Sequence, residues 1–496
     1  MKNAIVIRRM RLKGFIKKSL LLSVLASIVL IVFNTFKAAR RHPLDLQPRK
    51  VVVLDSTAVS NLQQSVGIAT VSYDDSVGHE VPGIDSLIEF LNIQYPLTFT
   101  HLECDTVNSH SLLLSWKGSD HRLKPVILYA HMDVVPALED SANGWRFDAF
   151  PSLPDYDTVR GRGTIDDKLG VIGILEATER LMKRGYCPKR DIYIALGHDE
   201  ETGGLKGASM IAKELEKKGV KASWLLDEGG MVAEGIVPFV KNPVALVMIA
   251  EKGYMTVELT VESNGGHSSF PPKDSPIDII AGAIMRLKEN PAEKSISGTV
   301  ATFMEHAGPA MKFPYNTVFA NPWLFSSLIM NEYEKIPEGN ATIRTTRAWT
   351  MSHAGMKENV LPAHASATVN LRITPGSSIK EELDEIIKVV DDPRVKFRVH
   401  PGSMEPIAPS RLDSEGFIQI SDAIRRTFPD AVVAPNLSIA STDSRHFEKV
   451  TEQRYRFLPV RMNREILAGM HGKNERLPAK DFCESILFYE TLLGSQ

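Results

Sequence analysis

The sequence predicts an α/β fold, with a mostly parallel sheet flanked by helices, an inserted α+β domain and an apolar helix at the amino end. Three observations predict it. Between residues 124 and 230, short apolar runs alternate with helical patterns, as in an open parallel sheet. Segments 255–263 and 365–374 alternate apolar and polar residues, which is typical of half-exposed antiparallel strands. Residues 19–36 contain no charged residue.

The amino end is predicted to anchor the chain in a membrane. Residues 1–18 contain seven Lys or Arg and no acid, and we predict a cytosolic basic tail there, a transmembrane anchor at 19–36 and a stalk at 37–60. As a helix, the apolar run spans about 27 Å, close to the thickness of a bilayer's hydrocarbon core. The excess of basic residues before the run orients the amino end toward the cytosol. The remainder then lies in a vacuolar or lysosomal lumen or outside the cell; a cleaved signal peptide, giving a secreted protein, is the alternative.

Composition excludes several classes of protein. The chain has 496 residues, with 58 Lys plus Arg against 60 Asp plus Glu, so no strongly basic surface indicates a nucleic-acid partner. Three cysteines supply neither a disulfide framework nor a four-thiolate zinc site. The chain must therefore be stabilised by its own apolar core, which a chain of this length can bury.

Compact polar groups follow the predicted strands of the first half, and a fifth group lies near the carboxyl end. They are His131-Met132-Asp133, Asp166-Asp167, Asp199-Glu200-Glu201, Asp227-Glu228 and His471 to Glu475. Taken singly, each has an ordinary explanation, such as a helix N-cap, a solvated loop or a hydrogen-bonded histidine. Ligands collect at the carboxyl ends of strands in open α/β sheets, so the groups are expected to converge. Converging carboxylates repel one another unless cations lie between them, and the sequence therefore predicts a metal site.

The ordered set of motifs resembles the co-catalytic zinc peptidases that include aminoacylase, bacterial glutamate carboxypeptidase and carboxypeptidase S. The matching strings, which extend from about residue 85 to the end, are HMDVVP (131–136), GRGTIDDK (161–168), DEETGG (199–204), LDEGG (226–230), GGHSS (265–269), KENVLP (357–362), NLRITPG (370–376), TDSRHF (442–447) and HGKNER (471–476). The anchor, the NPWLF string (321–325) and TDSRHF make the chain most similar to the carboxypeptidase S branch. That branch also contains N-fatty-acyl amino acid synthase/hydrolases.

The resemblance implies two Zn²⁺ per subunit. Asp166 would bridge both ions, His131 and Asp227 would complete one site, and Glu201 and His471 the other. Relatives differ over which acid of the LDEGG string is the ligand, and we expect Asp227 rather than Glu228. Imidazole nitrogen and carboxylate oxygen are ligand types that suit zinc.

The resemblance also implies the residues that act on the substrate. Glu200 would be the general acid/base and Asp133 would orient His131, as metal-bound imidazoles usually require. His267 would stabilise the tetrahedral oxyanion. In some relatives this histidine comes from a partner subunit, so a homodimer is possible. The expected substrate-binding residues are Asn359, Arg372 and Arg445.

These expectations define a domain plan and a function. Residues 61–253 and 396–496 would form the zinc-peptidase catalytic domain, and 254–395 a lid/dimerisation domain. The expected function is a zinc-dependent carboxypeptidase/amidohydrolase that releases a C-terminal amino acid from short peptides of the Gly-X type by metal-activated water. One alternative is an N-fatty-acyl amino acid hydrolase/synthase, and a second is a non-catalytic luminal receptor on a peptidase fold. The apolar stretch 323–329 is expected in the core, at an oligomer contact or at an acyl-binding surface near the membrane.

Overall fold

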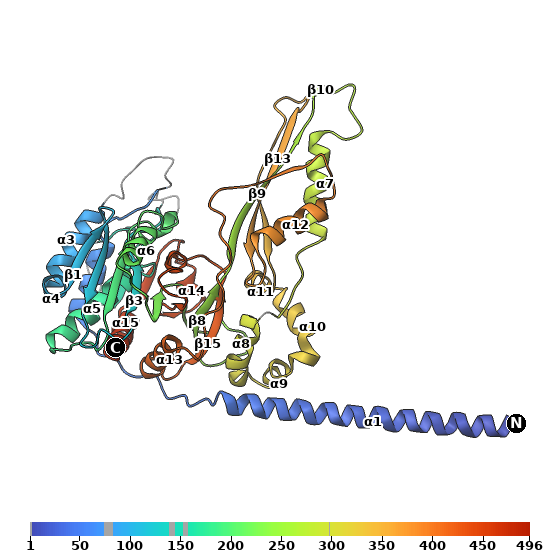
Figure 1. The fold of residues 1–496 in the computed structure, drawn as a ribbon, viewed down its shortest axis with the longest axis horizontal. Coiled ribbons are helices and arrows are strands. Elements are labelled where there is room, and N and C mark those ends of the chain that lie inside the picture. Colours follow the sequence, from blue (N-terminus) through green and yellow to red (C-terminus); the bar gives the residue numbers. More distant parts are fainter. Residues whose placement is uncertain (1, 74–82, 138–143, 152–156, 297) are drawn as a thin grey trace.

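The structure is a computed structural model that describes residues 2–73, 83–137, 144–151, 157–296 and 298–496, with side chains from Phe15 onward. Most basic residues of the predicted cytosolic tail therefore lie outside the described side chains. Figure 1 shows a large sheet with helices on both faces, a lid that extends from it, and the long helix α1 (Lys2–Arg41) below them.

The described part of the large sheet has ten strands, in the order β1-β2-β5-β3-β6-β16-β8-β7-β17, with β15 paired to β8. Their bounds are β1 (Glu103–Val107), β2 (Ser111–Trp116), β3 (Val126–His131), β5 (Ile192–Gly197), β6 (Trp224–Asp227), β7 (Met231–Ala233), β8 (Val244–Glu251), β15 (Val432–Ser438), β16 (Arg454–Arg456) and β17 (Arg461–Met462). Strands β5, β3, β6 and β16 run parallel to one another, whereas β1 and β2 are antiparallel to their neighbours. The predicted mostly parallel sheet is confirmed at its centre.

Alternation along each central strand fixes two packed layers. Val126, Leu128 and Ala130 of β3 pack on one face, while Ile127 and Tyr129 pack on the other. The first face is covered by α2 (Ser56–Val66), α3 (Ile84–Gln94), α5 (Lys168–Lys183), α13 (Glu415–Thr427) and α15 (Ala479–Leu493), and α4 (Pro96–His101) lies beside α5. The second is covered by α6 (Ala208–Lys217). Strands buried on both sides explain the continuous apolar runs in the sequence.

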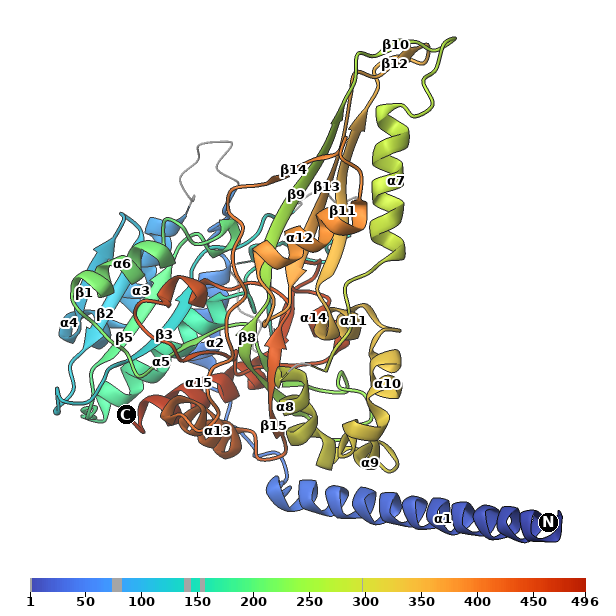
Figure 2. The ribbon, with the colours of Figure 1, turned by 45° about the vertical axis from the view of Figure 1, so that its right-hand side comes forward.

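The lid is built on a four-stranded antiparallel sheet. Its order is β11-β13-β9-β14, from β9 (Gly253–Glu262), β11 (Thr346–Ala354), β13 (His364–Ile373) and β14 (Lys396–Val399). Helices α7 (Pro276–Glu289) and α12 (Ile379–Val390) share an apolar core with it. Buried and half-buried residues alternate along β9, as the sequence pattern predicts. At the far end of the lid, β10 (Gly266–His267) pairs with β12 (Val360–Leu361) (Figure 2).

Two placements bear on the predicted domain plan. β14 begins at Lys396 and pairs with β9, so the lid sheet continues past residue 395. Helix α8 (Gly298–Ala307), although it lies within 254–395, packs against β8 and β15 of the large sheet. Helices α9 (Tyr315–Phe319), α10 (Pro322–Tyr333) and α11 (Pro337–Ile343) follow it. Sequence alternation reports a strand's exposure but not which sheet it joins, and the domain boundaries stay a prediction.

A single residue separates β8 of the large sheet from β9, the first strand of the lid. Lys252 lies between β8 and β9, it is buried, and its ammonium donates to the backbone carbonyls of Ala341 and Arg344 at 2.7 Å each. A Cβ at Gly253 would lie 2.8 Å from the carbonyl oxygen of Met404, because a returning segment crosses at the same point. The two sheets therefore meet in a packed junction.

Helix α1 contains a segment that is long and apolar enough to cross a membrane. By length and composition this segment is Phe15–Arg41, and its apolar side chains are exposed. Near its carboxyl end, α1 lies against α9 and the short helix η4 (Gly308–Ala310). The helix is consistent with the predicted anchor, and a signal sequence has the same character.

Candidate metal centre

The predicted strand-end groups converge because of strand order. β3 lies between β5 and β6 and runs parallel to both, so the residues that follow these strands share one edge of the sheet. His131 is the last residue of β3, and Glu200 and Glu201 lie in the 3₁₀ helix η3 (Glu200–Thr202) after β5. Asp166 lies just before α5, whose N-cap is Asp167. His471 arrives from the carboxyl-terminal segment.

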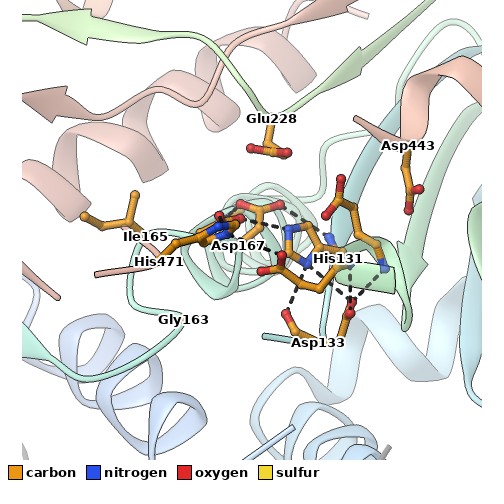
Figure 3. Close-up of polar contacts among 12 residues, drawn as sticks. His131, Asp133, Gly163, Ile165, Asp167, Glu228, Asp443 and His471 are labelled. Carbon is orange, nitrogen blue, oxygen red and sulfur yellow. Dashed lines mark hydrogen bonds and ion pairs between the residues drawn. The ribbon is translucent and has the colours of Figure 1, made fainter. Parts of the chain in front are cut away.

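Three groups of side chains among the described residues can each hold a metal ion. The groups are His131 with Asp166 and Glu228, Asp166 with Glu201 and His471, and His131 with Glu200 and Glu201. The first two share Asp166. Its Oδ1 lies 3.0 Å from His131 Nε2 and its Oδ2 lies 2.9 Å from His471 Nε2. Figure 3 shows these two histidines with Glu228 near them. Each carboxylate oxygen thus faces one histidine, which is the arrangement that a bridging ligand needs.

The structure favours Glu228 over Asp227 as the second acid of the first group. We expected Asp227 to be a ligand, but its carboxylate belongs to none of the three groups. It accepts hydrogen bonds from the backbone N–H of Ser444 at 2.7 Å and of Glu228 at 2.8 Å. Asp227 therefore holds the Thr442–Ser444 segment, while the next residue points to His131 and Asp166. The geometry therefore favours Glu228 in place of the expected Asp227, because one backbone donor of Asp227 comes from Ser444, 217 residues away in the sequence.

Asp133 connects the first histidine with the glutamate turn. Its backbone oxygen lies 3.0 Å from His131 Nδ1, and its Oδ1 lies 3.4 Å from the same nitrogen. A proton on Nδ1 leaves Nε2 free to act as a ligand. The Asp133 carboxylate also accepts from the backbone N–H groups of Glu200 and Glu201 at 3.1 and 3.2 Å, and from Ser72. One buried acid thus orients both the imidazole and the turn.

The electrostatics of the cluster are those of crowded acids. Burial raises the pKa of Glu200 well above its usual range, and the neighbouring acids Asp443, Glu228 and Glu201 raise it further. Burial also raises the pKa of Glu228, with Asp166 adding to the effect. Hydrogen bonds to Asp166 and Glu201 raise the pKa of His471 to about 10. Protons compensate the negative charge in the absence of cations, and divalent cations would replace them.

The residues present fit a divalent metal centre. Glu201 Oε1 is buried and has no hydrogen-bond partner among the described residues, so this oxygen is available to a ligand. The donors are imidazole nitrogens and carboxylate oxygens without thiolate, a set that suits zinc and related divalent ions. His471 adopts φ 51°, a left-handed conformation that few residues other than glycine and asparagine adopt. Uncommon backbone at a functional side chain is frequent in active sites.

Glu475 is a site residue whose role the sequence did not reveal. It is fully buried, and its carboxylate accepts from the backbone N–H of Gly163 at 3.0 Å, from that of Ile165 at 2.7 Å and from Arg162 Nη1 at 2.8 Å. These bonds tie the loop before Asp166 to the segment that carries His471. The only signal in the sequence is the four-residue spacing from His471, which does not distinguish a buried acid from a solvated one.

The predicted substrate-binding residues fall into two places. Arg372 and Arg445 lie at the junction between the lid and the large sheet, where Arg372 Nη1 donates to Ser441 at 3.2 Å. Arg445 is ion-paired with buried Glu251, which also pairs with Arg456 at 3.0 Å. Among the described residues, no carboxylate pairs with Arg372, whose guanidinium lies 4.9 Å from the centre of the Tyr254 ring.

His267 and Asn359 lie together at the far end of the lid. His267 belongs to β10, and the backbone N–H of Ser268 donates to the carbonyl of Asn359 at 3.3 Å. Both residues are exposed. Figures 1 and 2 show β10 at the end of the lid that points away from the large sheet. Within one chain, the structure does not bring them to the cluster around Asp166.

Comparison with known proteins decides the family. The model of peptidase family M20/M25/M40 matches residues 127–495. The chain belongs to this family. The M20 chain is 38% identical to the N-fatty-acyl-amino acid synthase/hydrolase of Xenopus tropicalis over 439 residues, 88% of this chain and 85% of that protein. It is 35% identical to a probable carboxypeptidase S-like protein of Dictyostelium discoideum, over 94% of this chain and 91% of that one.

A solved structure supports the fold of this M20 chain. The M20 family metallo-carboxypeptidase of Sulfolobus solfataricus matches with a TM-score of 0.63 at 17% identity, covering 88% of this chain and 98% of that one. The predicted fold and the carboxypeptidase S branch are confirmed. The protein is a metal-dependent hydrolase, and the receptor alternative is set aside because family and ligand cluster agree.

Proposed function

We propose that this M20 hydrolase cleaves the amide bond between an acyl group and an amino acid whose carboxylate is free. The observation that carries the proposal is Arg372, a guanidinium at the junction of lid and large sheet without a carboxylate partner among the described residues. Burial lowers its pKa, yet arginine stays charged throughout the physiological range. A half-buried cation without a carboxylate partner favours an anionic ligand, and a substrate carboxylate fits its two-pronged donor geometry.

One short segment of the chain connects Arg372 with the metal-binding cluster. Arg372 donates to Ser441, and three residues later the backbone N–H of Ser444 donates to Asp227. Asp227 immediately precedes Glu228, which belongs to the first metal-binding group. The segment from Ser441 to Ser444 therefore contacts both Arg372, the predicted carboxylate binder, and Asp227, which precedes the proposed ligand Glu228. This supports a substrate held with its terminal carboxylate at Arg372 and its amide at the cluster.

We propose that two Zn²⁺ ions are held by this chain. His131, Asp166 and Glu228 would hold one, and Asp166, Glu201 and His471 the other. When bound, such ions polarise the scissile carbonyl and lower the pKa of water toward 7. Asp133 keeps His131 in the ligating tautomer, and Glu475 keeps the Asp166 loop in place. No serine or cysteine nucleophile is needed.

Glu200 is proposed as the general acid/base. Its side chain is half-buried and belongs to the group with His131 and Glu201. Its backbone N–H is fixed by Asp133, so the side chain starts from a rigid turn. Glu200 Oε would accept a proton from the attacking water and deliver it to the leaving nitrogen.

His267 and Asn359 are proposed to act on the site of a second copy of the chain. Both lie at the exposed end of the lid, and neither contacts the cluster of its own chain in the described part of the molecule. In a two-fold symmetric dimer each lid can reach the other subunit's site, because the same surface is used twice. There His267 would donate to the developing oxyanion. The active unit proposed is thus a homodimer.

We also propose that α1 anchors the protein, with the hydrolase on the luminal or extracellular side. The apolar segment Phe15–Arg41 supports a span, and the greater number of basic residues before the apolar run supports the orientation. A cleaved signal would instead remove α1 from the mature protein.

Two acyl groups fit the proposed bond. Short peptides of the Gly-X type are the first candidate, and similarity to a carboxypeptidase S-like protein supports them. N-fatty-acyl amino acids are the second, favoured by 38% identity to an N-fatty-acyl-amino acid synthase/hydrolase. Release of free amino acid from Gly-X dipeptides and from N-oleoyl amino acids by the metal-loaded protein decides between them.

The substitution Arg372→Ala tests the class as a whole. It should raise KM mainly for substrates with a free carboxylate, by about 10- to 100-fold, which corresponds to the loss of one charge-assisted contact. Arg347→Ala is a matched control, since this arginine also lies in the lid but near Glu382. Equal losses on free and carboxyl-amidated substrates would contradict the proposal.

A further inference from the structure

Helix α1 is fastened to the body of the protein at a level inside its apolar run. Asn321, which is fully buried, donates to the carbonyl of Ile31 at 3.2 Å and to the Thr35 hydroxyl at 3.4 Å. Its side-chain oxygen accepts from Asn34 at 3.0 Å. Ile31 lies five residues before Phe36, the end of the apolar run, and five residues correspond to about 7.5 Å along a helix.

Further contacts fasten α1 at the end of its helix. Arg41 is paired with Glu305 of α8 at 2.6 Å, and the rings of His42 and His306 lie 4.0 Å apart. Figures 1 and 2 both show α9 beside this part of α1, with α10 leading away from it. These contacts therefore join the carboxyl-terminal part of α1 to the α8–α10 region.

Helix α10 begins at this attachment and carries apolar side chains on its outer face as well as on its buried face. Its first charged residue is Glu332, eleventh of its twelve residues. Ile329 and Phe325 pack into the apolar core beneath the helix. Trp323, Leu324 and Leu328 point outward and are 51%, 48% and 49% exposed. We call these three residues the α10 surface.

A cluster of exposed large apolar side chains marks a surface that contacts another protein or a membrane. The α10 surface begins two residues after Asn321, which contacts α1 inside the span. A bilayer that surrounds residues 19–36 of α1 therefore reaches the level of Trp323. The Trp323 indole N–H donates to Asn321 at 3.1 Å, while half of the ring is exposed. An amphipathic ring at the membrane–water boundary is the usual position of tryptophan in membrane proteins.

We propose that the α10 surface contacts the boundary between headgroups and acyl chains of the bilayer that α1 spans. The protein then has two membrane contacts, a spanning helix and a surface helix, which fix how the hydrolase is oriented above the lipid. The inference rests on the proposed anchorage of α1. We name lipid as the partner of the α10 surface because the attachment to α1 sets the depth of this surface relative to the bilayer. Contact with a second copy of the chain or with an acyl substrate would be a contrary outcome of the test.

The test uses fluorescence of the full chain in phosphatidylcholine nanodiscs, with and without dibrominated acyl chains. Five tryptophans contribute, so the Trp323 signal is obtained by subtracting the spectrum of Trp323→Phe from that of the wild type. Brominated lipid should remove roughly half or more of this difference signal, because the ring lies at the interface. The matched control is Trp349→Phe, since Trp349 packs against the lid core and its difference signal should persist.

If aqueous iodide quenches the Trp323 signal and brominated lipid does not, the inference is overturned. Resistance to both quenchers would also overturn it, because it would indicate that another protein chain covers the surface. Should Trp323→Phe disturb folding, Leu328→Trp in the otherwise wild-type chain supplies a second reporter on the same surface, read as its difference from the wild type, with the same outcomes. Anchorage is measured separately by the amino-terminal sequence of the mature protein and by resistance to alkaline extraction. A cleaved α1 refutes the anchor, whereas an intact α1 with an unquenched Trp323 refutes the α10 contact alone.

Discussion

Replacing Glu475 by Gln keeps its size but removes the charge that holds two segments of the site. The carboxylate faces Arg162, whose side chain is also buried, and accepts from the N–H groups of Gly163 and Ile165. Removing one partner of a buried ion pair costs about 3–5 kcal/mol, because the other charge stays buried without compensation. We therefore expect a loss of this size in unfolding free energy. Since Asp166 follows Ile165, metal affinity should also fall by about 10- to 100-fold.

The measurement pairs urea unfolding of the metal-free protein with competition for zinc against a chelator of known affinity. Glu465→Gln is the matched control, because Glu465 lies ten residues earlier, pairs with Arg476 and is mostly exposed. An exposed pair contributes about 1 kcal/mol or less, so this control should be nearly silent in both assays. If Glu475→Gln matched the control, the account of how the Asp166 loop is held would be wrong.

Further expectations concern catalysis, subunit exchange and pH. Glu200→Gln should lower kcat by about 100- to 10,000-fold with metal content retained, whereas Glu201→Gln should lose metal. Elemental analysis combined with kinetics distinguishes the two variants. Near-normal turnover by Glu200→Gln would remove Glu200 from the mechanism. Equal amounts of inactive Glu200→Gln and His267→Ala, mixed under subunit exchange, should recover about a quarter of wild-type activity, since half the dimers are mixed and each has one complete site; no recovery would place His267 in its own subunit's site. Burial lowers the pKa of Lys252 to about 7, so between pH 7 and 10.5 the unfolded chain binds more protons and stability rises with pH. From pH 7 to 9 the wild type should gain about 2 kcal/mol over Lys252→Met in urea unfolding, and parallel profiles would contradict this.

The sequence was sufficient to predict the central sheet and most of the residues that converge at its edge, because both depend on patterns within single strands. Apolar strands predict a buried parallel sheet, and parallel strands bring their carboxyl ends to one edge. His131 and Asp166 follow from that rule together with the resemblance to zinc peptidases. The choice between Asp227 and Glu228 did not follow, because it depends on the backbone of Ser444, far away in the chain. Strand alternation indicates that the two side chains diverge but not which one meets the histidines.

Long-range packing also limited the prediction for the lid. The strands β9 and β13 were visible as alternating patterns, but the pairing of β14 with β9 and the packing of α8 on β15 involve partners distant in sequence. Arg445 matched a substrate-binding motif, yet its ion pair with Glu251 becomes visible only in the folded chain. Likewise, the position of His267 is set by the length of β9, a property that the motif GGHSS does not contain.

The one-residue connection between β8 and β9 determines where this hydrolase can be engineered. A peptide inserted beside Lys252 would break its bonds to Ala341 and Arg344 and force apart backbones already in contact at Gly253. The turns around Gly355 have open space and exposed backbone, so they should accept extra residues, as loop tips generally do. A small fluorophore at this outer end would leave the junction intact and would report on the proposed docking of His267 and Asn359 onto a second subunit.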